Sequence, residues 1–119
     1  MSENMVDLTT RTKQFALLII RLYAALPKTT EAQVIGKQLL RSGTSVGAHC
    51  RESTRARTNA EFVSKIEVGL QELEEAAYWI VLLVHANIVV AELISELQSE
   101  INELTAILVT CVKNAKARK

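Results

Sequence analysis

Apolar residues occur at alternating steps of four and three between Phe62 and Val84, which is the spacing of one helix face in a bundle. Similar spacing appears in three other runs of the chain, and only a few residues separate the runs. Short connections place consecutive helices side by side and antiparallel. The sequence therefore predicts an all-α fold, an antiparallel up-down-up-down four-helix bundle that residues 1–119 form as a single domain. The expected helices span about residues 9–25, 30–52, 58–86 and 90–115.

Polar residues at the expected helix ends support these boundaries. Thr30 and Gln33 have the spacing of a capping box at the start of the second helix, and Thr58 and Glu61 have it at the start of the third. Asn87 is expected to close the third helix in a left-handed conformation. The turns therefore have their own local signals in a chain that has one proline and four glycines.

The first expected helix is apolar on all sides, with eleven apolar residues among the twelve from Phe15 to Leu26. A helix of a monomeric bundle usually has an apolar stripe on one side only. Either this helix is the most central one, or it forms a subunit interface, and we favour the interface. A membrane span needs about 20 apolar residues, so no membrane contact is expected. The candidate interface residues are Phe15, Leu18, Ile19, Leu22, Tyr23, Gly43, Gly47 and Trp79.

Small residues interrupt the second expected helix between Arg41 and Ala48. Two glycines there cost roughly 2 kcal/mol of helix propensity relative to alanine. Gly43 and Gly47 are four residues apart and share a face, where they allow another backbone to come close. The run lacks the Gly-Lys-Ser/Thr ending of a phosphate loop, so it predicts close helix packing.

Charge is unevenly divided along the chain. Residues 1–58 contain nine Lys/Arg and four Asp/Glu, a net charge of +5, whereas residues 59–119 contain five and nine, a net charge of −4. A cluster of basic residues can bind the phosphates of RNA or DNA. Alternatively, these residues pair with glutamates of neighbouring helices or subunits. The candidate nucleic-acid-binding residues are Lys37, Arg41, Arg51, Arg55 and Arg57, and the tail after residue 112 is also basic.

The sequence offers little for catalysis or metal binding. A carboxylate-bridged di-metal bundle needs Glu-x-x-His on two helices, and neither His49 nor His85 has Glu three residues before it. His49 and Glu52 are spaced to form one hydrogen bond, which does not make a metal site. Cys50 and Cys111 lie in apolar patterns typical of buried thiols. We expect no catalytic residue, metal, cofactor or small-molecule substrate, and a cytoplasmic protein with reduced thiols.

The run from Gly36 to Ala48 resembles the signature of the bacterial four helix bundle protein family. That family includes proteins encoded in intervening sequences of 23S rRNA genes and the accessory variability protein of diversity-generating retroelements. The resemblance continues through Arg55–Arg57, Ala60–Phe62, Lys65, Glu72, Glu75 and Tyr78–Trp79. The chain differs from the family at His49, where the family usually has Asn, and its net charge of +1 contrasts with the strongly basic retroelement proteins.

The resemblance implies a four-helix bundle that assembles into a ring-like homopentamer without catalytic residues. It also implies RNA or ribonucleoprotein binding, which is clear for the retroelement branch. Two functional hypotheses follow for this chain. The first is a non-enzymatic oligomeric adaptor that binds nucleic acid or a ribonucleoprotein through the basic patch. The alternative is a protein–protein scaffold that binds no nucleic acid.

Overall fold

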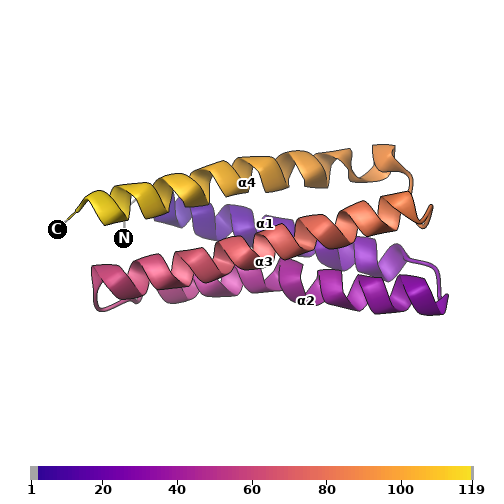
Figure 1. The fold of residues 1–119 in the computed structure, drawn as a ribbon, viewed down its shortest axis with the longest axis horizontal. Helices are drawn as coiled ribbons and strands as arrows, with labels where there is room; N and C mark the ends of the chain where they lie inside the picture. The colour runs from indigo at the N-terminus through magenta and orange to yellow at the C-terminus, as the bar shows by residue number, and fades with distance from the viewer. Residues whose placement is uncertain (1–2, 119) are drawn as a thin grey trace.

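The computed structural model describes residues 3–118, apart from the side chains of residues 3–6 and of Leu93. Four long helices run up, down, up and down, and the two ends of the chain lie at the same end of the bundle (Figure 1). The described residues contain no strand, so the predicted all-α bundle is confirmed. The helices are α1 (Glu3–Ala25), α2 (Thr30–Ser53), α3 (Asn59–His85) and α4 (Ala91–Ala117).

The predicted bounds of α2 and α3 agree with the structure to within one residue, but α1 begins six residues earlier than predicted. Thr9 was expected near the start of this helix and lies inside it, where its carbonyl accepts a hydrogen bond from the Thr12 hydroxyl at 3.2 Å. The additional turns place Leu8 in the core, where it is 1% exposed. Burial of Leu8 is the physical reason for the longer helix.

The cap of α2 is Thr29, so the predicted Thr30–Gln33 capping box is wrong. Thr29 has an extended backbone, and its hydroxyl accepts from the Ala32 N–H at 3.3 Å. The Gln33 side chain instead donates to the Pro27 carbonyl at 2.8 Å. The Gln33 amide is therefore bonded to the Pro27 carbonyl and does not reach back to the start of the helix, as a capping box would require.

The caps of α3 agree better with the sequence. The Thr58 hydroxyl accepts from the Glu61 N–H at 3.0 Å, as predicted, although the Glu61 carboxylate accepts from Arg57 N–H and not from that of Thr58. Asn87 has the expected left-handed backbone, with φ of 59°. The Ile88 N–H donates to the Leu83 carbonyl at 2.9 Å, which completes a Schellman ending.

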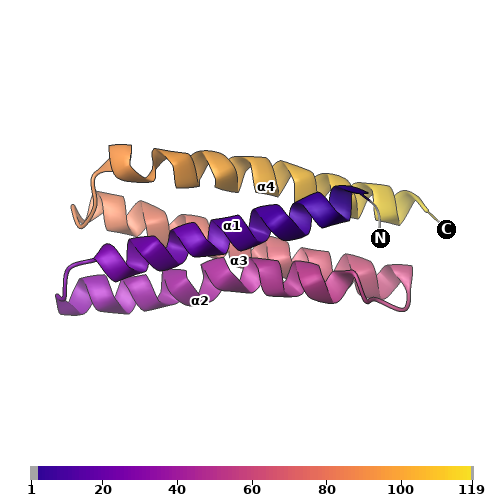
Figure 2. The same ribbon diagram turned by 180° about the vertical axis from the view of Figure 1, so that it is seen from behind.

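Two glycines lie on the face that α2 turns toward α1. A Cβ atom on Gly43 would lie 2.8 Å from Cγ1 of Ile19, and one on Gly47 would lie 3.3 Å from Oγ1 of Thr12. The glycines therefore allow the close helix packing that the sequence predicted, and the neighbouring helix belongs to the same chain (Figure 2).

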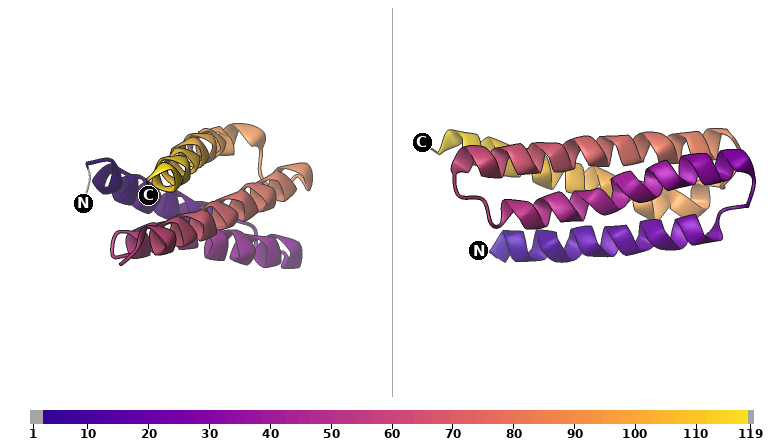
Figure 3. Two further views of the ribbon diagram at one scale, coloured as in Figure 1. Left: turned by 60° about the vertical axis from the view of Figure 1, so that its left-hand side comes forward. Right: turned by 90° about the horizontal axis from the view of Figure 1, so that it is seen from below.

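The helix α4 is less enclosed than the other three. It packs along α3, touches α1 only lightly and makes no close backbone approach to α2 within the described chain. The right-hand view in Figure 3 shows α2 between α1 and α3, with α4 behind them. Open hollows consequently flank α4 on both sides.

Candidate nucleic-acid interface

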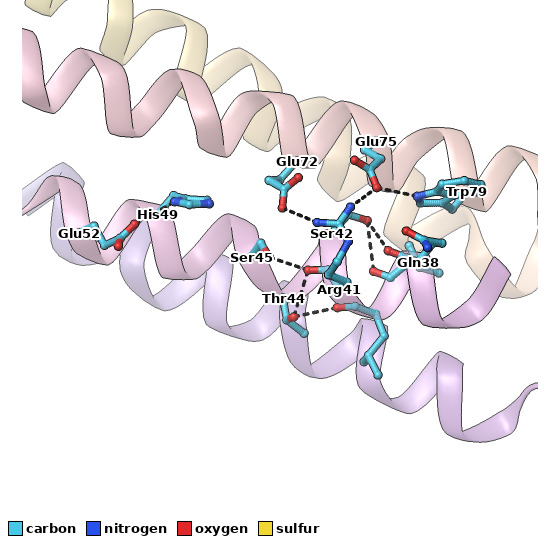
Figure 4. Close-up of polar contacts among 12 residues, drawn as sticks. Gln38, Arg41, Ser42, Thr44, Ser45, His49, Glu52, Glu72, Glu75 and Trp79 are labelled. Atoms are coloured by element: carbon cyan, nitrogen blue, oxygen red, sulfur yellow. Dashed lines mark hydrogen bonds and ion pairs between the residues drawn. The ribbon is translucent and has the colours of Figure 1, made fainter. Parts of the chain in front are cut away.

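The predicted basic patch is divided into two parts with different surroundings. In the middle of α2, the Arg41 guanidinium donates to Glu72 at 3.0 Å and also to Glu75, both of which lie on α3. The Glu75 carboxylate accepts the indole N–H of Trp79 at 3.0 Å as well (Figure 4). Arg41 therefore joins two helices, and its charge is balanced by acids of the same chain.

The pKa values in this cluster agree with that assignment. The Trp79 hydrogen bond, and after it the Arg41 guanidinium, hold the pKa of Glu75 below its usual value. The hydrogen bond to Glu75 in turn raises the pKa of Arg41. Each partner stabilises the charged form of the other. Arg41 is therefore less available to bind a phosphate than its position in the sequence indicated.

Lys37 is exposed one turn before Arg41, and no ion pair of Lys37 is found among residues 3–118. Fourteen residues separate it from Arg51, which corresponds to about 21 Å along a helix. Lys37 is therefore remote from the remaining arginines of the predicted patch.

The arginines at the end of α2 face solvent. Arg51 and Arg55 are one turn apart and line a shared hollow of about 490 Å³ together with Thr9, Glu52 and Thr54. Arg57 follows in the connection to α3 and is also exposed. Within the described chain, the guanidinium groups of these three arginines have no acidic partner, so their charges remain available to a partner.

The last turns of α4 bring further basic residues to the same end of the bundle. The Asn59 side chain donates to the Ala115 carbonyl at 2.6 Å, which ties the start of α3 to the end of α4. Lys116 forms an exposed pair with Glu67 at 3.3 Å. We call this surface the basic end. It consists of Arg51, Arg55, Arg57, Lys113, Lys116 and Arg118.

The sequence shows that the tail is basic, but only the fold shows that the tail lies beside the α2–α3 connection. More than fifty residues separate Arg57 from Lys113, and no short-range pattern connects them. The up-down-up-down topology is the signal that could have found this arrangement. It returns the end of α4 to the end of the bundle at which α2 finishes (Figure 1).

Glu52 is the acid nearest to this surface along α2, and two other side chains already contact its carboxylate. The ring Nδ1 of His49 lies 2.8 Å from the Glu52 carboxylate, as the spacing of the two residues predicted (Figure 4). The Lys65 ammonium lies 3.8 Å from the same carboxylate. Glu52 is thus already occupied, which leaves Arg51 and Arg55 without it.

The thiols are in environments that do not favour reactivity. Cys50 is fully buried, and burial raises the pKa of its thiol to about 12. Burial also raises the pKa of the half-buried Cys111. A thiol nucleophile needs a lowered pKa and access to solvent. No group of three or more His, Cys, Asp or Glu side chains is placed to hold a metal ion within the described chain.

Several of the predicted interface residues lie inside the protomer. Phe15 and Ile19 are 0% exposed, and the glycines that were grouped with them, Gly43 and Gly47, pack against α1. These four are not available to a partner because one chain already covers them. The other four predicted residues are partly buried against the core: Leu18, Leu22, Tyr23 and Trp79.

Other apolar side chains lie on the outer surface and were not predicted from the sequence. The most exposed are Val34, Tyr78, Val90, Ile20, Val109 and Val81. None of the four helices, over the residues described, is long and apolar enough to cross a membrane.

A family model and a solved structure that match this chain agree with each other. The family model for the 23S rRNA-intervening sequence protein matches residues 5–110. A crystal structure from Bacteroides thetaiotaomicron is similar over 92% of this chain and 98% of its own, with 31% identity and a TM-score of 0.87. That protein is described as one of unknown function from the S23 ribosomal protein family. Comparison with curated proteins finds no significant match.

Proposed function

We propose that this chain, which belongs to the 23S rRNA-intervening sequence protein family, acts without catalysis as an oligomeric protein that binds nucleic acid or a ribonucleoprotein. The basic end is the binding surface in this proposal. The observation that carries it is the position of Arg51, Arg55 and Arg57, which have no acidic partner within residues 3–118 and lie at the end where α4 contributes Lys113 and Arg118.

The chemistry of the basic end favours contact with phosphates. Arginine offers a planar fork of donors that matches a phosphate, and lysine offers a point charge. Each cation that contacts a duplex phosphate releases bound counterions and makes the affinity depend on salt. Stacking on bases uses aromatic side chains, and the aromatic pair of this chain, the exposed Tyr78 and the partly buried Trp79, lies far along α3 from its start. The proposed contact is therefore with the backbone and independent of base sequence.

Assembly strengthens such a contact. A single basic end contains few cations. In an oligomer, once one basic end has bound, the others are held near the same nucleic acid at a high effective concentration. The resemblance to the four helix bundle family favours a ring-like homopentamer as the assembly.

The salt dependence of binding tests this proposal. Fluorescence anisotropy with a labelled 20-base-pair RNA duplex, at 50 to 300 mM salt, would compare wild type with R51A/R55A and with the control K28A/K37A. Both variants lose two positive charges from exposed positions. We expect the double-logarithmic salt slope to become shallower by about 1.8 in R51A/R55A and to change much less in the control.

Two results would contradict the proposal. Wild-type protein that does not bind the duplex at 50 mM salt would remove nucleic-acid binding altogether. If the salt slope became shallower by the same amount in both variants, binding would depend on the net charge of the protein and not on the basic end.

A protein–protein scaffold without nucleic-acid affinity is the second candidate. The exposed Tyr78 favours this candidate, because tyrosine and tryptophan are common at binding hot spots. The ring centroids of Tyr78 and Trp79 lie 5.1 Å apart in an edge-on contact. Light scattering combined with the 260/280 nm absorbance ratio separates the candidates. The scaffold requires an oligomer that neither carries nor takes up nucleic acid.

A further inference from the structure

One face of α1 has apolar residues between two basic ones, and no helix among residues 3–118 packs over it. Ile20 is 45% exposed, and the partly buried Leu17 lies outside the group of residues that pack against the core. Lys13 and Arg21 are spaced four residues before and after Leu17, which places all of them on one side of the helix. We call Lys13, Leu17, Ile20, Arg21 and Ala24 the α1 stripe.

This stripe does not face either neighbouring helix. The residues of α1 that approach α2 are Thr12, Ile19 and Tyr23, which meet its glycines. Arg11 marks the side toward α4, because its guanidinium pairs with Glu100 at 2.7 Å. Lys13 and Arg21 form no ion pair with any residue that the structure describes, so the stripe is free along its length.

A groove of complementary character runs between α3 and α4. It is a hollow of about 330 Å³ in which Val81 is 39% exposed. Glu74 lies one turn before the groove on α3 and is exposed. The groove is lined by Ala77, Ile80, Val81, Gln98, Ile101 and Asn102.

The helices that form the groove are acidic. No lysine or arginine occurs between Lys65 and Lys113, whereas this segment contains eight glutamates. Arg41, Arg11 and Lys116 pair with five of these glutamates. Glu74, Glu92 and Glu96 have no cationic partner among residues 3–118.

We propose that the α1 stripe of one copy docks into the α3–α4 groove of a second copy, with Lys13 and Arg21 beside the unpaired glutamates. Leu17 and Ile20 then cover Val81 and Ala77, and the charges set the orientation from the rim. The inference rests on the proposed function in one respect, namely that copies of the chain assemble. It goes beyond that proposal because it says which two faces meet.

Such a contact joins two different faces, so every added copy leaves one stripe and one groove open. A contact of this kind closes only as a ring, or else continues as a filament. The stripe from Lys13 to Ala24 is about 17 Å long by helix rise, and the bundle is 50 Å long. The stripe therefore forms the centre of the contact, and the flanking turns complete it.

Two single substitutions test the pairing. Ile20→Arg places a charge in the stripe and leaves the groove intact, and Val81→Arg does the reverse. Both side chains are exposed, so the fold should persist in each variant. Val34→Arg is the matched control, because Val34 is 59% exposed and belongs to neither surface. Light scattering after size exclusion should show an oligomer for wild type and V34R, and monomers for I20R and V81R.

Mixing the two monomeric variants gives the sharper result. I20R retains a groove and V81R retains a stripe, so one intact contact can form and no further copy can add. We expect a 1:1 dimer, with a molar mass near twice that of the 13.2 kDa chain. A symmetric contact between identical faces would not be restored by mixing.

The outcomes separate this inference from the proposed function. An oligomer that persists in either I20R or V81R, a mixture that stays monomeric, or a V34R variant that also dissociates would overturn the docking while wild-type assembly stands. A wild-type monomer would overturn both the assembly and the docking.

Discussion

Two stretches of the chain, one in the middle of α2 and one at its end, each begin with an arginine and are used in different ways. The middle stretch, from Arg41 to Gly47, is engaged on both sides: Arg41 pairs with two glutamates of α3, and Gly43 lies against Ile19 of α1. At the end of the helix Arg51 is exposed, as are Arg55 and Arg57 in the connection that follows, and none of the three pairs with an acid of the described chain. Both stretches are basic, yet only the first holds the bundle together.

The difference shows that the neighbours of a charge decide its role. An arginine opposite glutamates on an adjacent helix is balanced within the fold, and its loss lowers stability. An arginine at a helix end without such neighbours contributes little to stability and is free to meet a phosphate. Substitutions in the middle of α2 should therefore change unfolding, whereas those at its end should change binding.

The largest effect is expected from Gly43→Val. A Cβ atom at this position would already lie 2.8 Å from Cγ1 and 3.3 Å from Cβ of Ile19. The close atoms include the base of a branched side chain, which cannot turn aside. Overpacking of this kind costs about 2–3 kcal/mol, which urea unfolding monitored by the single Trp79 would measure. A loss below about 0.5 kcal/mol would show that α1 moves away easily.

The next effect is expected from Arg41→Ala, which removes both ion pairs to α3. We expect a loss of about 1 kcal/mol, at the upper limit for partly exposed pairs, because Glu72 and Glu75 are left side by side. Arg51→Ala is the matched control and should stay within about 0.5 kcal/mol of wild type. Similar losses in the two variants would erase the distinction between the stretches.

The fold was largely predictable because the chain has consistent local signals. Apolar spacing located all four helices, and Asn87 and Thr58 were correctly placed at helix ends. The errors lie where two local signals compete. Thr29 and Thr30 are both residues that can cap a helix. Thr29 is the cap in the structure, where the Gln33 amide donates to the Pro27 carbonyl.

The surfaces were less predictable, since exposure depends on which helices become neighbours. Helical spacing shows that Phe15 and Ile20 lie on different sides of α1, but it does not show which side α2 covers. The pairing of Arg41 with Glu75 crosses 34 positions of sequence, and the contact of Asn59 with the Ala115 carbonyl crosses 56. These contacts follow from topology and helix rotation, which periodicity alone does not supply.

A smaller effect of opposite sign is expected on the other side of α2. A Cβ atom on Gly69 would lie 3.7 Å from Cβ of His49 and 3.8 Å from the Val46 carbonyl, which are ordinary contacts. Gly69→Ala should therefore stabilise the protein by about 0.5–1 kcal/mol through helix propensity. The same thermal or urea unfolding experiment measures it. Destabilisation would mean that α2 is packed as tightly against α3 as against α1.

The smallest effect concerns the charge of Glu75 and depends on pH. Its pKa is lower in the folded protein than the value of about 4.3 in an unfolded chain. Its contribution to stability is therefore complete above that value and is lost as the pH falls through the folded pKa. Glu75→Gln keeps an oxygen that can accept the Trp79 N–H, so the substitution removes the charge alone.

We expect E75Q to be about 0.5 kcal/mol less stable than wild type at pH 7, as is usual for a partly exposed pair. The difference should shrink as the pH is lowered from 7 to 3, because the wild-type carboxylate takes up a proton as the pH falls through its folded pKa. Urea unfolding at the two pH values, with Trp79 fluorescence as the signal, measures this difference. A gap that stays the same at both pH values would show that the charge of Glu75 does not hold Arg41 in the middle of α2. The contrast between the two stretches would then rest on the Glu72 pair and on packing at Gly43.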